Sequence, residues 1–250
     1  MVPALTIAVV LTVASVSAAA AGPFETKQRT YERVRGAFER HRDDVERAFR
    51  DGGAAWPPRG VFIRAFKLDG VLELWAEGAK AARGGERVLV RRFAICASSG
   101  VLGPKRREGD LQVPEGFYTI DRFNPRSSYH VSLGLDYPNA VDRARAGKEP
   151  PGGDIFIHGD CVTIGCMPLE DVPMEWLYVA AVIAKDRGQD EIPVHVFPFR
   201  LGTPEADAYS AAAPPELRAF WAVLARGYEA FEATRVPPRV RPTRKGYVFD

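Results

Sequence analysis

The chain has 250 residues, of which 46% are hydrophobic and 26% charged, and its formal net charge at pH 7 is +2. This length allows one substantial hydrophobic core, or such a core with a small appendage. Because the positive and negative charges nearly balance, the chain lacks the basic character of a nucleic-acid-binding protein. It also contains no nucleotide, flavin or metal motif, so we expect no cofactor, no metal and no nucleic-acid or nucleotide partner.

Residues 1–22 carry no charged side chain and end in a run of small residues. The apolar part is too short to cross a bilayer comfortably, and the alanines at 19–21 fit a signal-peptidase cleavage site. We therefore predict that residues 1–21 are a signal peptide and that the chain is exported to the periplasm or cell envelope. The first residues lack Lys and Arg, which leaves an uncleaved N-terminal membrane anchor as the alternative.

Residues 25–49 combine both charge signs with apolar residues at helical spacing, which predicts an amphipathic helix within an N-terminal helical segment of residues 22–55. From residue 61 the pattern changes to short runs of β-forming residues bounded by Gly, Pro, Asp or Asn. These runs predict a mainly β, largely antiparallel core inside a domain of residues 56–202. They cover residues 61–66, 71–76, 88–97, 117–123, 129–135, 155–158 and 194–199.

Two further helices are predicted in the second half of the chain. Residues 174–185 fit a helix that follows the strand at 155–158. An apolar stripe between residues 217 and 231 predicts a helix in a C-terminal segment of residues 203–235, packed on the core. Residues 236–250 form a basic, Pro-rich tail that we expect to be a solvated extension, with docking on an anionic envelope polymer as the alternative. The predicted fold class is therefore α+β, with helices flanking the β core at both ends.

The most informative stretch is residues 155–167, where an apolar run ends in His158 and Cys166 follows after Gly165. A thiol becomes a useful nucleophile when a base takes its proton and polar surroundings hold the thiolate. Gly165 lets the backbone approach a substrate closely, and the amides of Gly165 and Cys166 can then face a developing oxyanion. This arrangement favours acyl transfer through a thioester, with Cys166 as nucleophile and His158 as base.

Two alternatives use the same residues. His158, Cys161 and Cys166 are ligand types that zinc accepts, but a fourth ligand and the usual paired spacing are missing. Three cysteines in an exported chain leave at least one thiol free. We expect Cys96, which lies in an apolar run, to be buried core. Cys161 then either packs the loop or bonds with Cys166 under oxidising conditions and switches the site off.

Several further motifs stand in order around this stretch. They are Ser-Gly-Val-Leu-Gly-Pro-Lys at 99–105, Glu-Gly-Asp at 108–110, Pro-Glu-Gly-Phe-Tyr-Thr-Ile at 114–120, Asn-Pro-Arg-Ser at 124–127, Tyr-His-Val-Ser at 129–132, Tyr-Pro-Asn at 137–139 and Ile-Pro-Val-His-Val-Phe-Pro-Phe at 192–199. Together with residues 155–167, this set resembles the catalytic domain of the L,D-transpeptidase (YkuD-type) family, in its YafK-like branch. The resemblance covers about residues 60–200 and implies an L,D-transpeptidase-type core, a mainly β sandwich of antiparallel or mixed sheet. The commoner branch has a longer connection from histidine to cysteine, a second histidine beside the glycine and a polar residue soon after the cysteine. This chain has Ile164 and Pro168 at the last two places.

The resemblance implies an enzyme that acts on peptidoglycan stem peptides at meso-diaminopimelate, without a cofactor. Cys166 attacks the diaminopimelyl carbonyl to form a thioester, and His158 serves as base and then as acid. Gly165, Ile164 and Thr163 form the loop that supplies the oxyanion amides, and Thr163 orients this loop or His158, or simply bonds to backbone.

What resolves the thioester decides the reaction. An amine acceptor gives a transpeptidase, which joins two stems or attaches a wall-linked lipoprotein, and this is the reading we favour. Water gives a hydrolase that cuts such bonds, an activity the same branch also contains. A non-catalytic peptidoglycan-binding module is the alternative of another class, although the chain keeps both the thiol and the histidine.

A zwitterionic diaminopimelate end needs groups of both charge signs. The candidates for substrate binding are the polar and aromatic residues of the matching motifs, namely Lys105, Glu108, Asp110, Glu115, Tyr129 and His130. Each of them alone also fits a turn or surface residue. His130 is the rival to His158 as base, whereas His41 belongs to the charged helix and His195 to a predicted core strand.

Overall fold

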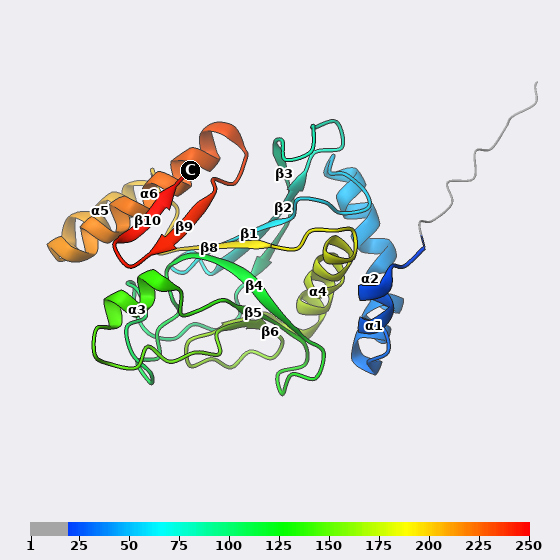
Figure 1. The fold of residues 1–250 in the computed structure, drawn as a ribbon, viewed down its shortest axis with the longest axis horizontal. Coiled ribbons are helices and arrows are strands. Elements are labelled where there is room, and N and C mark those ends of the chain that lie inside the picture. The colour runs from blue at the N-terminus through cyan, green and yellow to red at the C-terminus, as the bar shows by residue number, and fades with distance from the viewer. Residues whose placement is uncertain (1–19) are drawn as a thin grey trace, which may run out of the picture.

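The computed structural model describes residues 20–250, so all but the last two residues of the predicted signal peptide lie outside the described part. An eight-stranded mixed sheet runs through the middle of the molecule, and helices pack against it on two sides (Figure 1). The fold is therefore α+β, as the sequence predicts. None of the helices between residues 20 and 250 has the length and apolar composition that a membrane crossing requires.

The strands of the sheet follow the order β3-β2-β1-β8-β4-β5-β6-β7. Neighbours are antiparallel except for β1 with β8 and β6 with β7, which are parallel. Of these eight strands, β8 comes last in the sequence, but it lies in the centre of the sheet, between β1 and β4. The strands are β1 (Phe62–Phe66), β2 (Val71–Glu77), β3 (Arg87–Ala94), β4 (Gly116–Asn124), β5 (Ser132–Leu135), β6 (Phe156–His158), β7 (Met167–Pro168) and β8 (Pro193–Phe197).

Each of the seven predicted strand runs overlaps one of these strands, and only the short β7 was not predicted. The run at 129–135 is the least accurate, because its first three residues form a loop in which His130 takes a positive φ of 65°. A period-two pattern cannot distinguish such a loop from the strand that continues it.

One face of the sheet is covered by the N-terminal helices α1 (Pro23–Gln28) and α2 (Glu32–Asp51), together with α4 (Asp171–Asp186). The predicted helix at 25–49 is thus broken, because Tyr31 has an extended backbone. Every residue from Met174 to Ala184 is buried, so α4 is the central helix of this layer. The Asp186 carboxylate accepts the backbone amides of Gly22 and Phe24, which fixes the start of α1.

The second apolar cluster packs α6 (Pro215–Thr234) against the aromatic residues of β1, β4 and β8. The short helices α3 (Ala140–Ala146) and α5 (Pro204–Ala212) lie at this end of the molecule (Figure 1). The expectation of a solvated tail is wrong, because residues 236–250 contain a hairpin of β9 (Val240–Thr243) and β10 (Gly246–Phe249). Tyr247 of β10 is buried against Phe117, so apolar burial overrides the basic composition of the tail.

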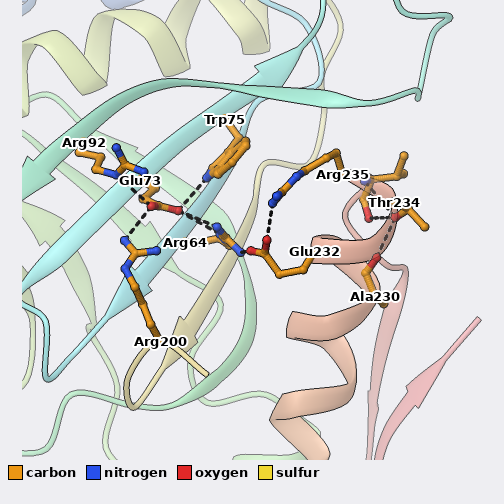
Figure 2. A network of polar contacts seen from close by, with 10 residues as sticks. Arg64, Glu73, Trp75, Arg92, Arg200, Ala230, Glu232, Thr234 and Arg235 are labelled. Carbon is orange, nitrogen blue, oxygen red and sulfur yellow. Dashed lines mark hydrogen bonds and ion pairs between the residues drawn. The ribbon is translucent and has the colours of Figure 1, made fainter. Parts of the chain in front are cut away.

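A buried cluster of charges joins the sheet to α6 (Figure 2). Glu73 on β2 is fully buried and accepts hydrogen bonds from Arg64 at 2.8 Å, from the indole of Trp75 at 2.9 Å and from Arg200 at 2.7 Å. Arg64 is buried as well and pairs with Glu232 of α6 at 2.6 Å. A buried charge is costly unless it is paired and hydrogen-bonded. The complete cluster therefore fixes where α6 sits on the sheet.

Candidate active site

The pairing of β6 with β7 places the predicted nucleophile beside the strand that carries the predicted base. The two strands are parallel, with His158 opposite Pro168. Cys166, two residues before Pro168, therefore lies beside Phe156 at the start of β6. Because a strand rises about 3.3 Å per residue, Cys166 and His158 are separated by about 7 Å along the strand direction.

Backbone groups at the start of β6 hold the thiol of Cys166. The amide of Phe156 donates to Sγ at 3.4 Å, and the thiol donates to the carbonyl of Asp154 at 3.6 Å. Burial raises the pKa of Cys166; the Phe156 amide opposes this shift, the Asp154 charge adds to it, and the Lys105 charge opposes it. The resting thiol is therefore protonated at neutral pH.

His158 is buried at the end of β6, with Nδ1 2.6 Å from the carbonyl oxygen of Gly159. A carbonyl can only accept, so Nδ1 carries the proton and Nε2 keeps the lone pair that a base needs. Burial lowers the pKa of His158, in spite of that hydrogen bond and the Asp160 charge, so the ring is neutral at pH 7. The ring of Tyr129 covers it at a centroid distance of 4.9 Å. In the described part of the chain no hydrogen bond joins His158 to Cys166, as is common before substrate binds.

The loop that carries the predicted nucleophile is closed by the hydroxyl of Thr163. This oxygen accepts the backbone amides of Gly165 at 3.1 Å and Cys166 at 2.8 Å, and it donates to the Cys166 carbonyl at 2.9 Å. The two amides that the sequence predicts for an oxyanion are thus occupied by a side chain in the resting site. Neighbouring Ile164 is 78% exposed, so it faces solvent beside the thiol.

Gly165 is required at its position by the backbone. Its φ is +136°, which residues with a Cβ rarely adopt, and a Cβ there would lie 3.0 Å from the carbonyl oxygen of Gln112. The loop that contains Gln112 therefore packs directly against the residue before the nucleophile.

A disulfide ties the loop between His158 and Cys166 to the segment after β3. Cys96 and Cys161 are bonded, with their Cα atoms 5.5 Å apart, and Cys166 is the free cysteine among residues 20–250. The expectation of one free thiol is confirmed. The expectations that Cys96 is a simple core residue, and that Cys161 packs the loop or pairs with Cys166, are wrong. The partners are 65 residues apart, and they meet where the Cys96 amide donates to the carbonyl of Pro168 in β7.

The disulfide also removes Cys161 from the set of zinc ligands considered above. Among residues 20–250, no group of three or more His, Cys, Asp or Glu side chains is placed to hold a metal ion.

Three predicted substrate-binding residues lie on the loop that precedes β4. The ammonium group of Lys105 is buried and pairs with Asp110 at 2.6 Å, so these two side chains partner each other. The Asp110 carboxylate also accepts the backbone amides of Arg106 and Arg107, which closes the loop. Glu108 is exposed on the same loop.

Glu115 lies deeper, with a fully buried side chain. Its carboxylate accepts hydrogen bonds from Lys67 at 3.0 Å, from the backbone amide of Gly103 at 2.7 Å and from the indole of Trp221 at 2.8 Å. The Glu115 carboxylate is thus hydrogen-bonded by groups of the protein itself. Glu115 therefore anchors the loop to the sheet and to α6, and it does not face a substrate in this structure.

His130 belongs to a second polar cluster. Its Nε2 lies 2.7 Å from the carboxylate of Glu175 on α4, which also binds Arg40 at 2.7 Å and His41 at 2.8 Å, both from α2. Burial would raise the pKa of Glu175, but the hydrogen bonds from Arg40, His130 and His41 lower it. The cluster joins three elements beneath the loop that holds Tyr129 over His158.

Sequence reasoning did not single out Glu175, although an acidic residue inside an otherwise apolar helix is a usable signal. It also missed Asp154, Phe156 and Gln112, which act through backbone atoms and leave no side-chain signature. His195, by contrast, lies where the sequence placed it. It is buried on β8, and burial lowers its pKa to about 3.

The protonated thiol of Cys166 lies just before β7, and the neutral, buried imidazole of His158 lies at the end of β6. Together with the loop between them, they define a candidate acyl-transfer site. The model of the YkuD family, the L,D-transpeptidase catalytic domain, matches residues 76–196. YafK of Escherichia coli (strain K12), itself named as a candidate L,D-transpeptidase, is 35% identical over 190 residues, which are 75% of this chain and 73% of that protein. The chain therefore belongs to the YkuD L,D-transpeptidase family.

Solved structures give a weaker likeness. The helical cell shape determining protein Pgp2 of Campylobacter jejuni, as its K307A mutant, matches with a TM-score of 0.44 at 23% identity. That match covers 66% of this chain and 57% of the other. L,D-transpeptidase 1 of Mycobacterium tuberculosis matches with a TM-score of 0.31 at 13% identity, covering 54% and 60% of the two chains. Family membership follows from the sequence relative and the family model.

Proposed function

We propose that the chain is a peptidoglycan L,D-transpeptidase in which Cys166 is the nucleophile and His158 the general base and acid. The observation that carries this proposal is the pairing of β6 with β7, which sets a free thiol beside the strand that ends in a neutral imidazole. Family membership supports the reaction class, and family members act on peptidoglycan stem peptides.

The protonation states define the first step. His158 Nε2 removes the thiol proton as Sγ attacks the carbonyl of a diaminopimelyl residue, which gives a tetrahedral oxyanion. Collapse expels the amine of the following residue, which takes the proton from His158, and leaves a thioester on Cys166. An incoming amine then loses its proton to His158, attacks the thioester and restores the thiol. Water in place of the amine gives hydrolysis with the same proton transfers.

The oxyanion needs donors, and the amides of Gly165 and Cys166 are the nearest pair on the loop. Each such donor contributes roughly 10²–10³ in rate. Because both amides bond to Thr163 in the resting site, this hydroxyl has to turn away for the oxyanion to take its place.

The disulfide supports the export predicted from residues 1–21. Disulfides persist in oxidising compartments such as the periplasm and are rare in the cytosol. A bond between Cys96 and Cys161 beside a free Cys166 suits an enzyme that works in the cell envelope.

The test is to incubate the exported chain with diaminopimelate-containing muropeptides, with and without a lysine peptide derived from a lipoprotein, and to follow products by mass spectrometry. A new cross-link or lysine adduct that disappears in Cys166→Ala supports the transpeptidase. Loss of a pre-made lysine adduct with incorporation of water identifies the hydrolase. Binding to sacculi that persists in Cys166→Ala, with no turnover by the parent, identifies a binding module.

A matched pair of histidine variants tests the base. We expect His158→Ala to abolish acylation of Cys166, whereas His130→Ala, which changes the Glu175 cluster, retains it. The reverse result would assign the base to His130.

A further inference from the structure

A groove of about 490 Å³ opens between the loop at residues 102–112 and the start of α6. Leu102 and Leu217 supply apolar walls from the two sides, and the loop contributes Arg106 and Arg107. Glu216 lines the groove from the first turn of α6. The groove thus combines an apolar interior with charges of both signs.

The groove lies next to the segment that packs against the nucleophile. Gln112 lines it, and the carbonyl of Gln112 is the group that would touch a Cβ at Gly165. Lys105, on the same loop, is close enough to Cys166 for its charge to oppose the rise in the pKa of that thiol. Gln112 is therefore a wall shared by the groove and by the loop that carries Cys166.

Four charged side chains line the groove, and three of them have no partner within residues 20–250. Asp110 is paired with Lys105, whereas the side chains of Arg106, Arg107 and Glu216 form no ion pair or hydrogen bond in that part of the chain. Loops at protein surfaces often carry unpaired charges. These charges differ in that the unpaired cations of the loop and the unpaired Glu216 of α6 line the same groove.

Arg145 is half-buried behind the loop, with its guanidinium 4.1 Å from the centroid of the Phe220 ring of α6. Burial lowers the pKa of Arg145, and the charge of Arg106 lowers it further. The Asp142 charge acts in the opposite direction, but its oxygens bond the Asn139 amide and the Tyr118 hydroxyl rather than Arg145. Arg145 does not line the groove, but its positive charge adds to that of Arg106.

We propose that this groove binds the free amino-acid end of a diaminopimelate side chain, with its carboxylate at Arg106 and its ammonium at Glu216. The proposal rests on the proposed function, since it names what holds the donor stem while its carbonyl is attacked. Three methylene groups separate the two ends of diaminopimelate, and they match the apolar walls at Leu102 and Leu217. A guanidinium binds a carboxylate through two parallel hydrogen bonds, which gives the contact its geometric specificity.

The test measures binding by calorimetry in the full exported chain carrying Cys166→Ala, so that no turnover occurs. The probes are a stem tetrapeptide with a free diaminopimelate end, the same peptide amidated at the side-chain carboxylate, and the same peptide acetylated at the side-chain amine. We expect amidation to weaken binding by roughly tenfold, and Arg106→Gln to weaken binding of the free peptide by a similar factor. In Arg106→Gln, amidation should have little further effect, because its partner is already absent.

The same cycle with Glu216→Gln and the acetylated peptide tests the ammonium contact. The matched control is Arg83→Gln, since Arg83 is an exposed arginine on the β2–β3 connection that makes no ion pair within residues 20–250. The affinity of the Arg83→Gln variant for the free peptide should equal that of the parent. Melting temperatures of all variants should agree, because each replaced side chain is exposed.

An amidation effect that stays the same in Arg106→Gln overturns the proposal, and so does the absence of peptide binding. Competition by inorganic phosphate at Arg106, without coupling to the peptide carboxylate, also overturns it and indicates a phosphate site. A failure of the proposed function gives a different combination of binding and turnover. Coupled binding in the Cys166→Ala chain, with no Cys166-dependent turnover by the parent, leaves the groove assigned and removes the enzyme. Turnover without coupling removes only the groove.

Discussion

The hydroxyl of Thr163 closes a ring of hydrogen bonds on Cys166, accepting its amide at 2.8 Å and donating to its carbonyl at 2.9 Å. One side chain thereby shapes the turn that presents the nucleophile and occupies the amides that an oxyanion needs. These two roles oppose each other, and they can be separated by substitution.

Thr163→Val keeps the shape of the side chain and removes the hydroxyl. We expect acylation of Cys166 to slow by roughly 10- to 100-fold, because the loop loses the bonds that orient the thiol. Thr163→Ser keeps the hydroxyl and should stay near the parent rate. Rates come from mass spectrometry of the acylated protein under single-turnover conditions. A Thr163→Val protein that acylates faster than the parent would mean that the hydroxyl acts mainly as a plug on the amides.

The disulfide between Cys96 and Cys161 closes a loop of 65 residues. Replacing both cysteines by serine should lower the free energy of unfolding by about 4 kcal/mol at most, since the unfolded chain regains the entropy of that loop. Denaturant unfolding measures the change. Cys166→Ser, which leaves the bond in place, is the control and should unfold near the parent midpoint. Peptide mapping of unreduced protein should yield a 96–161 cross-link, and a 161–166 cross-link would refute the pairing.

The pKa shifts at the site predict a pH profile. Burial lowers the pKa of His158 below its usual value near 6.5 and raises the pKa of Cys166 above its usual value. In the proposed mechanism the active form is the neutral pair, so kcat/KM should fall on the acid side with an apparent pKa below about 6.5 and stay flat through pH 8. Alkylation by iodoacetamide in the absence of substrate should be slow at pH 6. Fast, pH-independent alkylation there would show a preformed thiolate–imidazolium pair instead.

The parts of the fold that the sequence predicts are those coded by local patterns. The strand runs, the apolar stripe of α6 and the histidine at the end of β6 each follow from spacing within a short window. The central place of β8 does not, because parallel pairing with β1 depends on contacts more than a hundred residues apart. The hairpin at 240–249 was missed for a related reason, since Tyr247 is buried by Phe117 from a distant strand.

The residues of the candidate site also fall into those that the sequence predicts and those that only the structure places. Cys166, His158 and Thr163 were predicted from residue type and order. The partner of Cys161 depends instead on the segment after β3, whose Cys96 amide donates to the Pro168 carbonyl of β7. Lys105 and Asp110 were predicted as candidate substrate-binding residues of the matching motifs. Their mutual ion pair is visible only in three dimensions, and Arg106 and Arg107 are left on that loop without a side-chain partner within residues 20–250.

The buried cluster around Glu73 gives the sharpest prediction on stability. Burial would raise the pKa of Glu73, but the charges and hydrogen bonds of Arg64, Arg200 and Trp75 lower it to about 2. A carboxylate with a depressed folded pKa contributes stability above its unfolded pKa, near 4.3, and this contribution is lost as pH falls toward 2. For a shift of this size the contribution is roughly 3 kcal/mol.

Glu73→Gln should therefore destabilise the chain by about 3–5 kcal/mol at pH 7, because Arg64 stays buried with only Glu232 as its partner. The variant should also lose less stability than the parent between pH 5 and pH 2. Arg92→Gln is the control, since Arg92 reaches Glu73 from an exposed position and should cost under about 1 kcal/mol. Urea unfolding at a series of pH values measures both effects. Parallel pH curves for the parent and Glu73→Gln would show that Glu73 is not the group whose protonation weakens the fold.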